Sequence, residues 1–184
     1  MGKEQLRMVR DNSPVYLPDA PEGYFMRSFE KGDEEDWCRC CIDGDLGITE
    51  ISVPQFERFM LEDDAVAPQN IYFLVHKTGE VAGTATHMFG KQPGEAIVHM
   101  VGITGKHQGK GLARYLNLYV IDKMIAGGVR SISLKTDDWR LPAIKTYLNC
   151  GFLPLITEPS MLQRWHDVAE KLGVEIKDRV IQEQ

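Results

Sequence analysis

The stretch that decides the fold is Val101-Gly-Ile-Thr-Gly-Lys-His-Gln-Gly-Lys-Gly-Leu-Ala113. A strand predicted over 95–103 runs into this glycine-rich turn. A helix predicted over 112–126, with an apolar residue at every fourth position, follows it. Backbone N–H groups at a helix N-terminus attract anions, and glycines let an anion approach the backbone closely. Three basic side chains lie in or beside the turn: Lys106, Lys110 and Arg114. The stretch therefore predicts a phosphate-binding loop between a strand and a helix.

Two common nucleotide-binding patterns do not fit this loop. The Walker A pattern needs a glycine five residues before Gly-Lys and a Ser or Thr after it, and neither Gly105-Lys106 nor Gly109-Lys110 has them. The dinucleotide pattern needs a third glycine where Arg114 stands. The loop also comes late in the chain, after a predicted hairpin. A P-loop nucleotide binder is therefore a disfavoured alternative.

Outward from the loop, the pattern predicts a mixed α/β domain. Strands are predicted over 24–29, 71–75, 81–89, 95–103, 131–136 and 152–156. Helices are predicted over 34–42, 53–61, 112–126, 142–150 and 160–172, the last capped by Ser160. We expect Phe56, Phe59 and Met60 to form the apolar face of the second helix. Hairpins come first and crossovers later, unlike the regular alternation of a Rossmann sheet or TIM barrel.

Composition bounds the class of protein. A chain of 184 residues with 43% hydrophobic residues suits one domain with its own core. The net charge of −6 argues against a nucleic-acid binder. The first ten residues lack a signal-peptide core, and the longest obvious apolar run, Ile71 to Val75, is too short to span a bilayer. We therefore expect a cytoplasmic protein that contacts neither nucleic acid nor membrane.

The cysteines do not indicate redox chemistry. Cys38 and Cys41 form a C-x-x-C pair after Trp37, but a reactive first cysteine needs a helix N-terminus. Here the acidic stretch 33–36 precedes the pair and opens the predicted helix, and carboxylates raise a thiol pKa. Core or surface cysteines are the preferred interpretation.

Two motifs together resemble one enzyme family. Gln108-x-x-Gly111-x-Ala113 resembles the pyrophosphate loop of the GNAT superfamily of acetyl-CoA-dependent N-acetyltransferases, and it occurs once, between a predicted strand and helix. One strand downstream, the segment 143–152, with Ala-x-x-x-Tyr-x-x-x-Gly-Phe, resembles the family's late helix. The resemblance covers about residues 23–158 and points to a bacterial branch. It implies an α/β (α+β) GNAT fold, in which helices flank a mixed, mostly antiparallel central sheet that splays at the acetyl-CoA site.

The same resemblance divides the chain. Residues 1–22, with three prolines, are expected to form an extended N-terminal arm, with its packing on the domain left open. Residues 23–158 form the acetyltransferase domain, and 159–184 a C-terminal helix and tail packed on it. The family usually closes with a hairpin of two strands, and here only 174–181 remains to supply the second.

The resemblance also implies where acetyl-CoA binds. The pantetheine arm would pair with backbone at Val101, Gly102 and Ile103. Gln108 opens the motif, and the pyrophosphate would bind N–H groups of Gly109, Lys110, Gly111, Leu112, Ala113 and Arg114. Arg140 departs from the family, which often has Asn there, and it could reach a phosphate or carbonyl instead.

Acetyl transfer needs a proton for the departing thiolate and an acceptor for the amine proton. Tyr147 matches the family's general acid, and a phenol pKa near ~10 suits the task; a packing role is the alternative. His99, on the strand before the loop, is the candidate base, with Glu95 as the other; a structural histidine in the sheet is the alternative for His99. The remaining histidines show no metal-ligand spacing, so no metal is expected.

Charge distribution suggests the acceptor. Residues 30–64 carry 12 acidic and 3 basic residues, whereas 99–151 carry 8 basic and 3 acidic ones. The basic stretch suits an anionic cofactor, and the acidic one suits a cationic amine, although solvated helix faces explain acidic runs equally well. The family resemblance thus implies an N-acetyltransferase acting on a primary amine of a small molecule or peptide in a ternary complex. The alternative is a non-catalytic acyl-CoA-binding regulatory module. A homodimer, the state of many family members, is one assembly that the resemblance allows.

Overall fold

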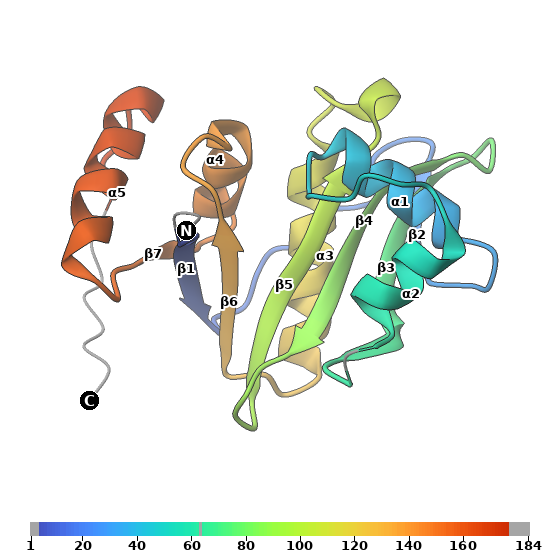
Figure 1. Ribbon diagram of the computed structural model, residues 1–184, viewed down its shortest axis with the longest axis horizontal. Coiled ribbons are helices and arrows are strands. Elements are labelled where there is room, and N and C mark those ends of the chain that lie inside the picture. Colours follow the sequence, from blue (N-terminus) through green and yellow to red (C-terminus); the bar gives the residue numbers. More distant parts are fainter. Residues whose placement is uncertain (1–3, 63, 177–184) are drawn as a thin grey trace.

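The computed structural model describes residues 4–62 and 64–176 and contains one seven-stranded sheet in the order β2-β3-β4-β5-β6-β1-β7 (Figure 1). The strands are β1 Leu6–Asp11, β2 Tyr24–Ser28, β3 Val66–His76, β4 Val81–Phe89, β5 Glu95–Ile103, β6 Ser131–Thr136 and β7 Leu153–Leu155. The helices are α1 Glu34–Asp43, α2 Val53–Met60, α3 Leu112–Ala126, α4 Leu141–Asn149 and α5 Pro159–Leu172, with a 3₁₀ turn, η1, at Gly105–His107. The predicted mixed, mostly antiparallel sheet with flanking helices is confirmed.

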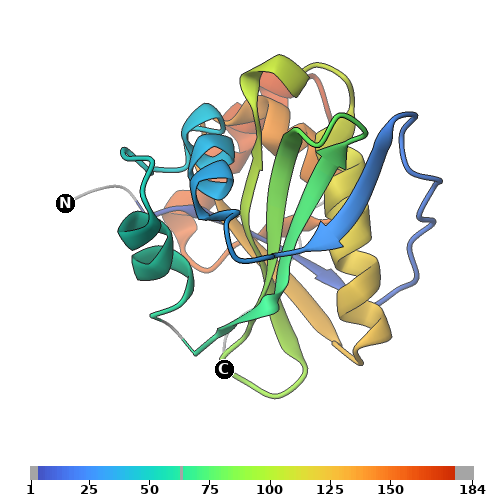
Figure 2. The same ribbon diagram turned by 90° about the vertical axis from the view of Figure 1, so that its right-hand side faces the viewer.

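Helices cover both faces of the sheet. Figure 2 shows the sheet between α3 on one side and α1 with α2 on the other. Leu116, Val120 and Met124 of α3 are fully buried and belong to the larger core cluster. Phe56 and Met60 of α2 belong to the smaller one, beneath α1. The prediction that Phe59 shares this apolar face is wrong, because its side chain is 38% exposed.

The sheet splays between β5 and β6. These two strands are parallel, but they pair only from Glu95 with Ser131 to Ile97 with Ser133. Beyond this point the strands separate toward their C-terminal ends (Figure 1). A bulge in β5 adds to the irregularity, since the β4–β5 register shifts between Thr86 and Thr84 and Met100 has a φ of 49°. The expected splay is therefore present.

The N-terminal strand β1 is a correction to the sequence analysis, which expected only an extended arm there. β1 lies inside the sheet, antiparallel to β6 over six residue pairs and to β7 over three. Leu6 and Met8 are fully buried. For a second closing strand, the sequence analysis had only 174–181 to offer. Residues 174–176 form no strand, and 177–181 lie outside the described residues.

The C-terminal helix α5 packs on the domain through Met161, Trp165 and Val168, all of them buried. Its N-cap is Glu158, with Pro159 in the first turn, so the expected cap at Ser160 is wrong. Proline suits this place because its missing N–H would have no helical partner.

None of the helices in the described part of the chain has the length and apolar character needed to span a membrane.

Candidate active site

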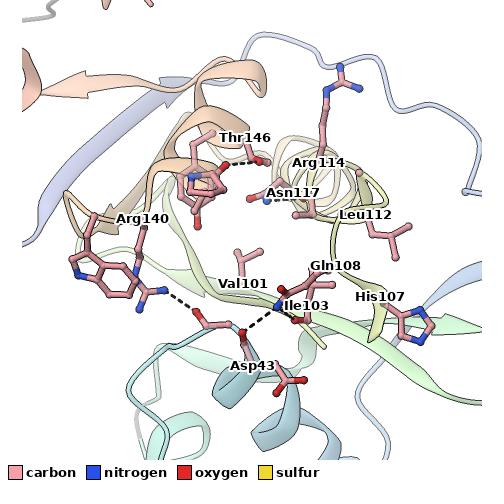
Figure 3. A pocket seen from close by; sticks show the side chains of 18 residues that line it. Asp43, Val101, Ile103, His107, Gln108, Leu112, Arg114, Asn117, Arg140 and Thr146 are labelled. Atoms are coloured by element: carbon pink, nitrogen blue, oxygen red, sulfur yellow. Dashed lines mark hydrogen bonds between the residues drawn. The ribbon is translucent and has the colours of Figure 1, made fainter. Parts of the chain in front are cut away.

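A pocket of about 570 Å³ lies at the splayed end of the sheet (Figure 3). The end of β5, the glycine turn, the start of α3 and the helix α4 form its walls. Predicted site residues that line it are Val101, Ile103, Gln108, Gly109, Gly111, Leu112, Ala113, Arg114, Arg140 and Tyr147. The structure therefore brings the two sequence motifs, which are some 30 residues apart, to one cavity.

The glycine turn depends on backbone conformation. Gly109 and Gly111 both have a φ of 75°, in the left-handed region that side chains other than glycine rarely adopt. Gly111 is also the N-cap of α3, whose first N–H groups have no partner within the helix. Arg114 adds a positive charge to the same wall of the pocket. This end of α3 can therefore hold an anion.

Gln108 stabilises the loop from inside. Its Nε2 donates hydrogen bonds to the backbone oxygens of Ile103 (3.0 Å) and Asp43 (3.1 Å). The Asp43 carboxylate in turn accepts a bond from the N–H of Gly105 (2.7 Å). Gln108 thus connects the glycine turn to the end of α1, and its side-chain donors already have protein partners.

Three predicted contributors lie differently from expectation. Gly102 and Lys110 are not among the residues that line the pocket. At Gly102, a Cβ would come within 2.3 Å of the Cys40 oxygen, so glycine is needed for the close approach of α1 to β5. Lys106 forms an ion pair with Glu80 (2.6 Å), and this pair holds the pKa of Glu80 below its usual value. The charge of Lys106 is therefore largely offset.

Arg140 connects the two sides of the splayed sheet. Its guanidinium donates to the backbone oxygens of Gly44 (3.0 Å) and Asp45, just beyond α1, and to the Asp137 carboxylate (3.1 Å). A cation is favourable at this end of α1, where carbonyl groups lack helical partners. The guanidinium also lies 4.5 Å from the centre of the Trp139 ring. Arg140 lines the pocket, but these contacts give it a structural task there.

Tyr147 projects from α4 into the pocket wall. Its ring packs edge-on against Phe152, with 6.2 Å between the ring centroids. Desolvation raises the pKa of the Tyr147 phenol to about 12, although the nearby charge of Arg140 acts in the opposite direction. The phenol is therefore protonated at neutral pH, and it can donate a hydrogen bond inside the pocket.

The two candidate bases lie outside the pocket lining. Glu95 begins β5, eight residues before Ile103, which is about 26 Å at the rise of a strand, and it accepts a bond from the N–H of Gln92. His99 is half-buried opposite Thr86, just before the bulge. Because neighbouring Val98 belongs to the core cluster on the α3 side, alternation turns His99 toward the face that carries α1.

Some residues of the wall carried no signal for sequence analysis. Asp43 and Gly44 come from α1, about 60 residues before the loop, and only folding brings them here. His107 is buried and forms a hydrogen bond with the Tyr24 hydroxyl (2.8 Å). Further residues of the wall are Asn117, Trp139, Pro142, Ala143 and Thr146. Ala143 and His107 belong to the two quoted motifs, and Asn117 is polar among the apolar residues of α3, so these three could have been suspected.

The cysteines do not suggest redox chemistry. All four cysteines are free and buried, and burial raises the pKa of the Cys150 thiol to about 11. The pKa of Cys38 is raised as well, which agrees with rejecting the redox interpretation. Across residues 4–62 and 64–176, no group of His, Cys, Asp and Glu side chains could hold a metal ion.

Comparison with known proteins gives consistent results. The sequence profile of the Acetyltransferase (GNAT) family matches residues 35–152. A mycothiol acetyltransferase of Pseudarthrobacter chlorophenolicus is 28% identical over 165 residues, which is 82% of this chain and 49% of that protein. The chain thus spans about half the length of the curated relatives it matches.

Solved structures agree on the fold. A GCN5-related N-acetyltransferase from Sphaerobacter thermophilus superposes with a TM-score of 0.64 at 20% identity, covering 83% of this chain and 49% of that one. The ribosomal-protein-S18-alanine N-acetyltransferase from Escherichia coli gives a TM-score of 0.54 at 19% identity, covering 70% and 76%.

Proposed function

Because this chain belongs to the GNAT acetyltransferase family, we propose that it transfers the acetyl group of acetyl-CoA to a primary amine of a small molecule or peptide, by direct attack within a ternary complex. The observation that carries the proposal is the shared pocket. The glycine turn at the start of α3 and Tyr147 of α4 belong to the walls of one cavity. One end of this cavity suits an anion, and the other offers a proton donor.

The residues of the pocket fit acetyl-CoA. Gly109 and Gly111 leave the backbone open at the N-terminus of α3, and an ideal Cβ on either would meet nothing within 4 Å. The pyrophosphate would bind there, beside Arg114. Val101 and Ile103 line the pocket past the last β5–β6 pair, and they would lie along the pantetheine arm. Acetyl-CoA would supply the activated acetyl thioester.

Tyr147 would serve the departing thiolate. A thiol of ordinary pKa, ~8.5, is a stronger acid than a phenol with a pKa of about 12. Full proton transfer from Tyr147 to the thiolate is therefore uphill, and the main contribution would be a hydrogen bond that stabilises the developing negative charge. In this chain, Tyr147 would therefore act chiefly as a hydrogen-bond donor to the thiolate, and less as the general acid that the family resemblance implies.

For the base we retain His99 and drop Glu95. His99 lies two residues before Val101, and its strand face is the one that carries α1, so it would accept the amine proton through water. Glu95 lies too far along the strand. Loss of His99 should lower the turnover of a charged amine, because no other predicted base would take its proton.

The acceptor would approach beside α1. The first turn of α1 contains Glu34, Glu35 and Asp36, of which Arg39 pairs with the last two. A cationic amine suits the remaining negative charge. The names of similar proteins cover both a small molecule, mycothiol, and a protein alanine, which keeps both acceptor classes in the proposal. A cytoplasmic location and a homodimer also remain part of it.

One observation favours a second candidate, a non-catalytic acyl-CoA-binding regulatory module. Neither Glu95 nor His99 lines the pocket, so its wall holds the donor Tyr147 without either predicted base. Release of CoA thiol separates the two functions, because a binding module would take up acetyl-CoA without consuming it.

Thermal unfolding with acetyl-CoA, ATP or NAD tests the proposal first. Ligand at about 100 times its dissociation constant adds ~2.7 kcal/mol, and each kcal/mol shifts the midpoint of this size of domain by roughly 2–4 °C. We expect an upward shift of several degrees with acetyl-CoA alone. A shift with ATP or none at all would contradict the assignment of the loop. An amine screen by thiol release then identifies the acceptor.

A further inference from the structure

Helix α3 contains a buried asparagine whose amide is only half satisfied. Asn117 is fully buried, and its Nδ2 donates to the backbone oxygen of Ala113, one turn earlier, at 2.8 Å. Its Oδ1 is buried and has no hydrogen-bond partner among the described residues. Since the Ala113 oxygen can only accept, the amide nitrogen must face it, and a flipped amide is excluded. The free end of Asn117 is therefore an acceptor.

This arrangement is unfavourable for stability alone. Leu116, Leu118 and Val120 are buried apolar neighbours in the same helix, so a leucine would fill the position at no polar cost. A buried amide oxygen without a partner destabilises the folded state relative to one that is paired. Such a group in a native protein calls for a missing partner.

The location indicates what that partner is. Asn117 belongs to the pocket wall, and in Figure 3 it reaches from α3 toward α4, on the side of Thr146. The Thr146 hydroxyl already donates to the Pro142 oxygen (2.9 Å) within α4. Asn117 lies six residues beyond Gly111, about 9 Å along the helix axis from the proposed pyrophosphate site. An N–H donor from a ligand in the pocket would satisfy this acceptor oxygen, whereas a phosphate, which offers only acceptors, would not.

We propose that Asn117 Oδ1 accepts a hydrogen bond from an amide N–H of the pantetheine arm of the acyl-CoA donor. This inference rests on the proposed function and adds a specificity residue to the same site. Coenzyme A carries two such amides between its pyrophosphate and its sulfur. Asn117 lines the same pocket as the glycine turn and Tyr147, so its Oδ1 would contact the arm between the pyrophosphate and the sulfur.

The experiment measures binding and stability together in Asn117→Leu. Calorimetry would compare acetyl-CoA with adenosine bisphosphate, a fragment of the coenzyme that lacks the arm and the second phosphate of the pyrophosphate. We expect acetyl-CoA to bind about five- to tenfold more weakly, adenosine bisphosphate to bind as before, and the midpoint of thermal unfolding to rise. Met124→Leu, a volume-conserving change in the same buried helix, is the matched control and should change neither affinity.

Each other outcome has a distinct meaning. Unchanged acetyl-CoA affinity in Asn117→Leu would overturn the inference. So would an equal loss for both ligands with a lower unfolding midpoint, which indicates a structural role. If Asn117→Leu does not fold, Asn117→Ala provides the same comparison of ligands. If the wild-type chain binds no acetyl-CoA, the proposed function itself fails and the inference with it.

Discussion

The two halves of the sheet are assembled in different ways. Strands β2 to β5 follow one another in sequence order and are all antiparallel neighbours. Strands β6 and β7 lie close together in the chain, on either side of α4, but the strand between them is the distant N-terminal β1. The first half is thus a set of local hairpins, whereas the second depends on contacts between the two ends of the described chain.

The pocket lies where these halves meet. Val101 and Ile103 come from the first half, and Arg140 and Tyr147 from the second. The two halves share only a short parallel ladder, which ends at Ile97. The geometry of the pocket therefore depends on how firmly β1 holds the second half together and on how firmly Arg140 bridges the gap. The predictions below test this dependence.

Removal of β1 should have the largest effect. Deleting residues 1–11 removes the fully buried Leu6 and Met8 and leaves β6 and β7 without their shared partner. Burial of such side chains contributes about 2–5 kcal/mol each, comparable with the whole stability of many domains. We expect loss of cooperative unfolding in a denaturant titration.

A point variant provides the matched control for β1. Met8→Ala should lower the free energy of unfolding by about 2–5 kcal/mol, whereas Arg7→Ala, on the neighbouring and partly exposed position, should change it little. If residues 12–184 unfolded with the wild-type midpoint, β1 would not hold the second half together.

The next largest effect concerns turnover. Tyr147→Phe should reduce turnover about 100-fold while the dissociation constant of acetyl-CoA changes less than about twofold, because the hydroxyl would act on the thiolate and not on the bound thioester. Tyr119→Phe is the control, because Tyr119 packs against Tyr72 and is not among the residues that line the pocket. A thiol-release assay measures turnover, and calorimetry measures the dissociation constant of acetyl-CoA. Equal turnover in Tyr147→Phe would remove Tyr147 from the mechanism.

Tyr147 also has a pH signature. With a pKa of about 12, the phenol remains protonated throughout the neutral and mildly alkaline range. A fall in rate on the acidic side would therefore belong to the base or to the amine, and it should persist in Tyr147→Phe. A fall between pH 8 and pH 9 that Tyr147→Phe abolishes would contradict this assignment.

The bridge across the gap should contribute less. Arg140→Met keeps much of the side-chain volume but removes the donors to Gly44 and Asp45. Bonds from a charged donor contribute about 1.5–3 kcal/mol, so we expect a loss of roughly 2 kcal/mol and weaker acetyl-CoA binding. Arg39→Met is the control, because its ion pairs lie in solvent. If Arg140→Met lowers neither stability nor affinity, the bridge is unimportant.

The contrast between the halves also explains what sequence could predict. The helices and strands from residue 24 onward follow local patterns, and β4, β5 and β6 have the predicted bounds. The strand β1 was missed because half of its residues, Arg7, Arg10 and Asp11, are charged and because a proline-rich stretch follows it. Its place between β6 and β7 depends on contacts more than 100 residues away, to which a local pattern is blind.

The site shows the same division. A motif identifies which residues surround the ligand, since Gln108, Gly111, Ala113 and Tyr147 all line one pocket. It does not reveal which donors already have partners. The side chains of Gln108 and Arg140 are bonded to carbonyls near the end of α1, and α1 lies about 60 residues or more from both. Roles set by tertiary partners need the structure.

The smallest effect is a pH dependence of stability in the second half. Cys150 ends α4, and its backbone oxygen accepts a bond from the buried Arg10 of β1 (2.9 Å). Burial raises the pKa of the Cys150 thiol from about 9 to about 11. The folded state therefore keeps this proton more strongly than the unfolded one. The resulting stability is fully present below pH 9 and is lost as the pH rises through 11.

Denaturant titrations at pH 7, 9 and 10 measure this loss. At pH 10, halfway between the two pKa values, the wild type should have lost about 1 kcal/mol through Cys150. Between pH 7 and pH 10, the free energy of unfolding of Cys150→Ala should therefore fall by about 1 kcal/mol less than that of the wild type. The variant nevertheless starts from a lower stability at pH 7. Cys40→Ala, beneath α1, provides the comparison for the first half, because burial raises the pKa of that thiol as well. If the free energy of unfolding falls equally with pH in Cys150→Ala and in the wild type, ionisation of Cys150 does not destabilise the junction of α4 and β1.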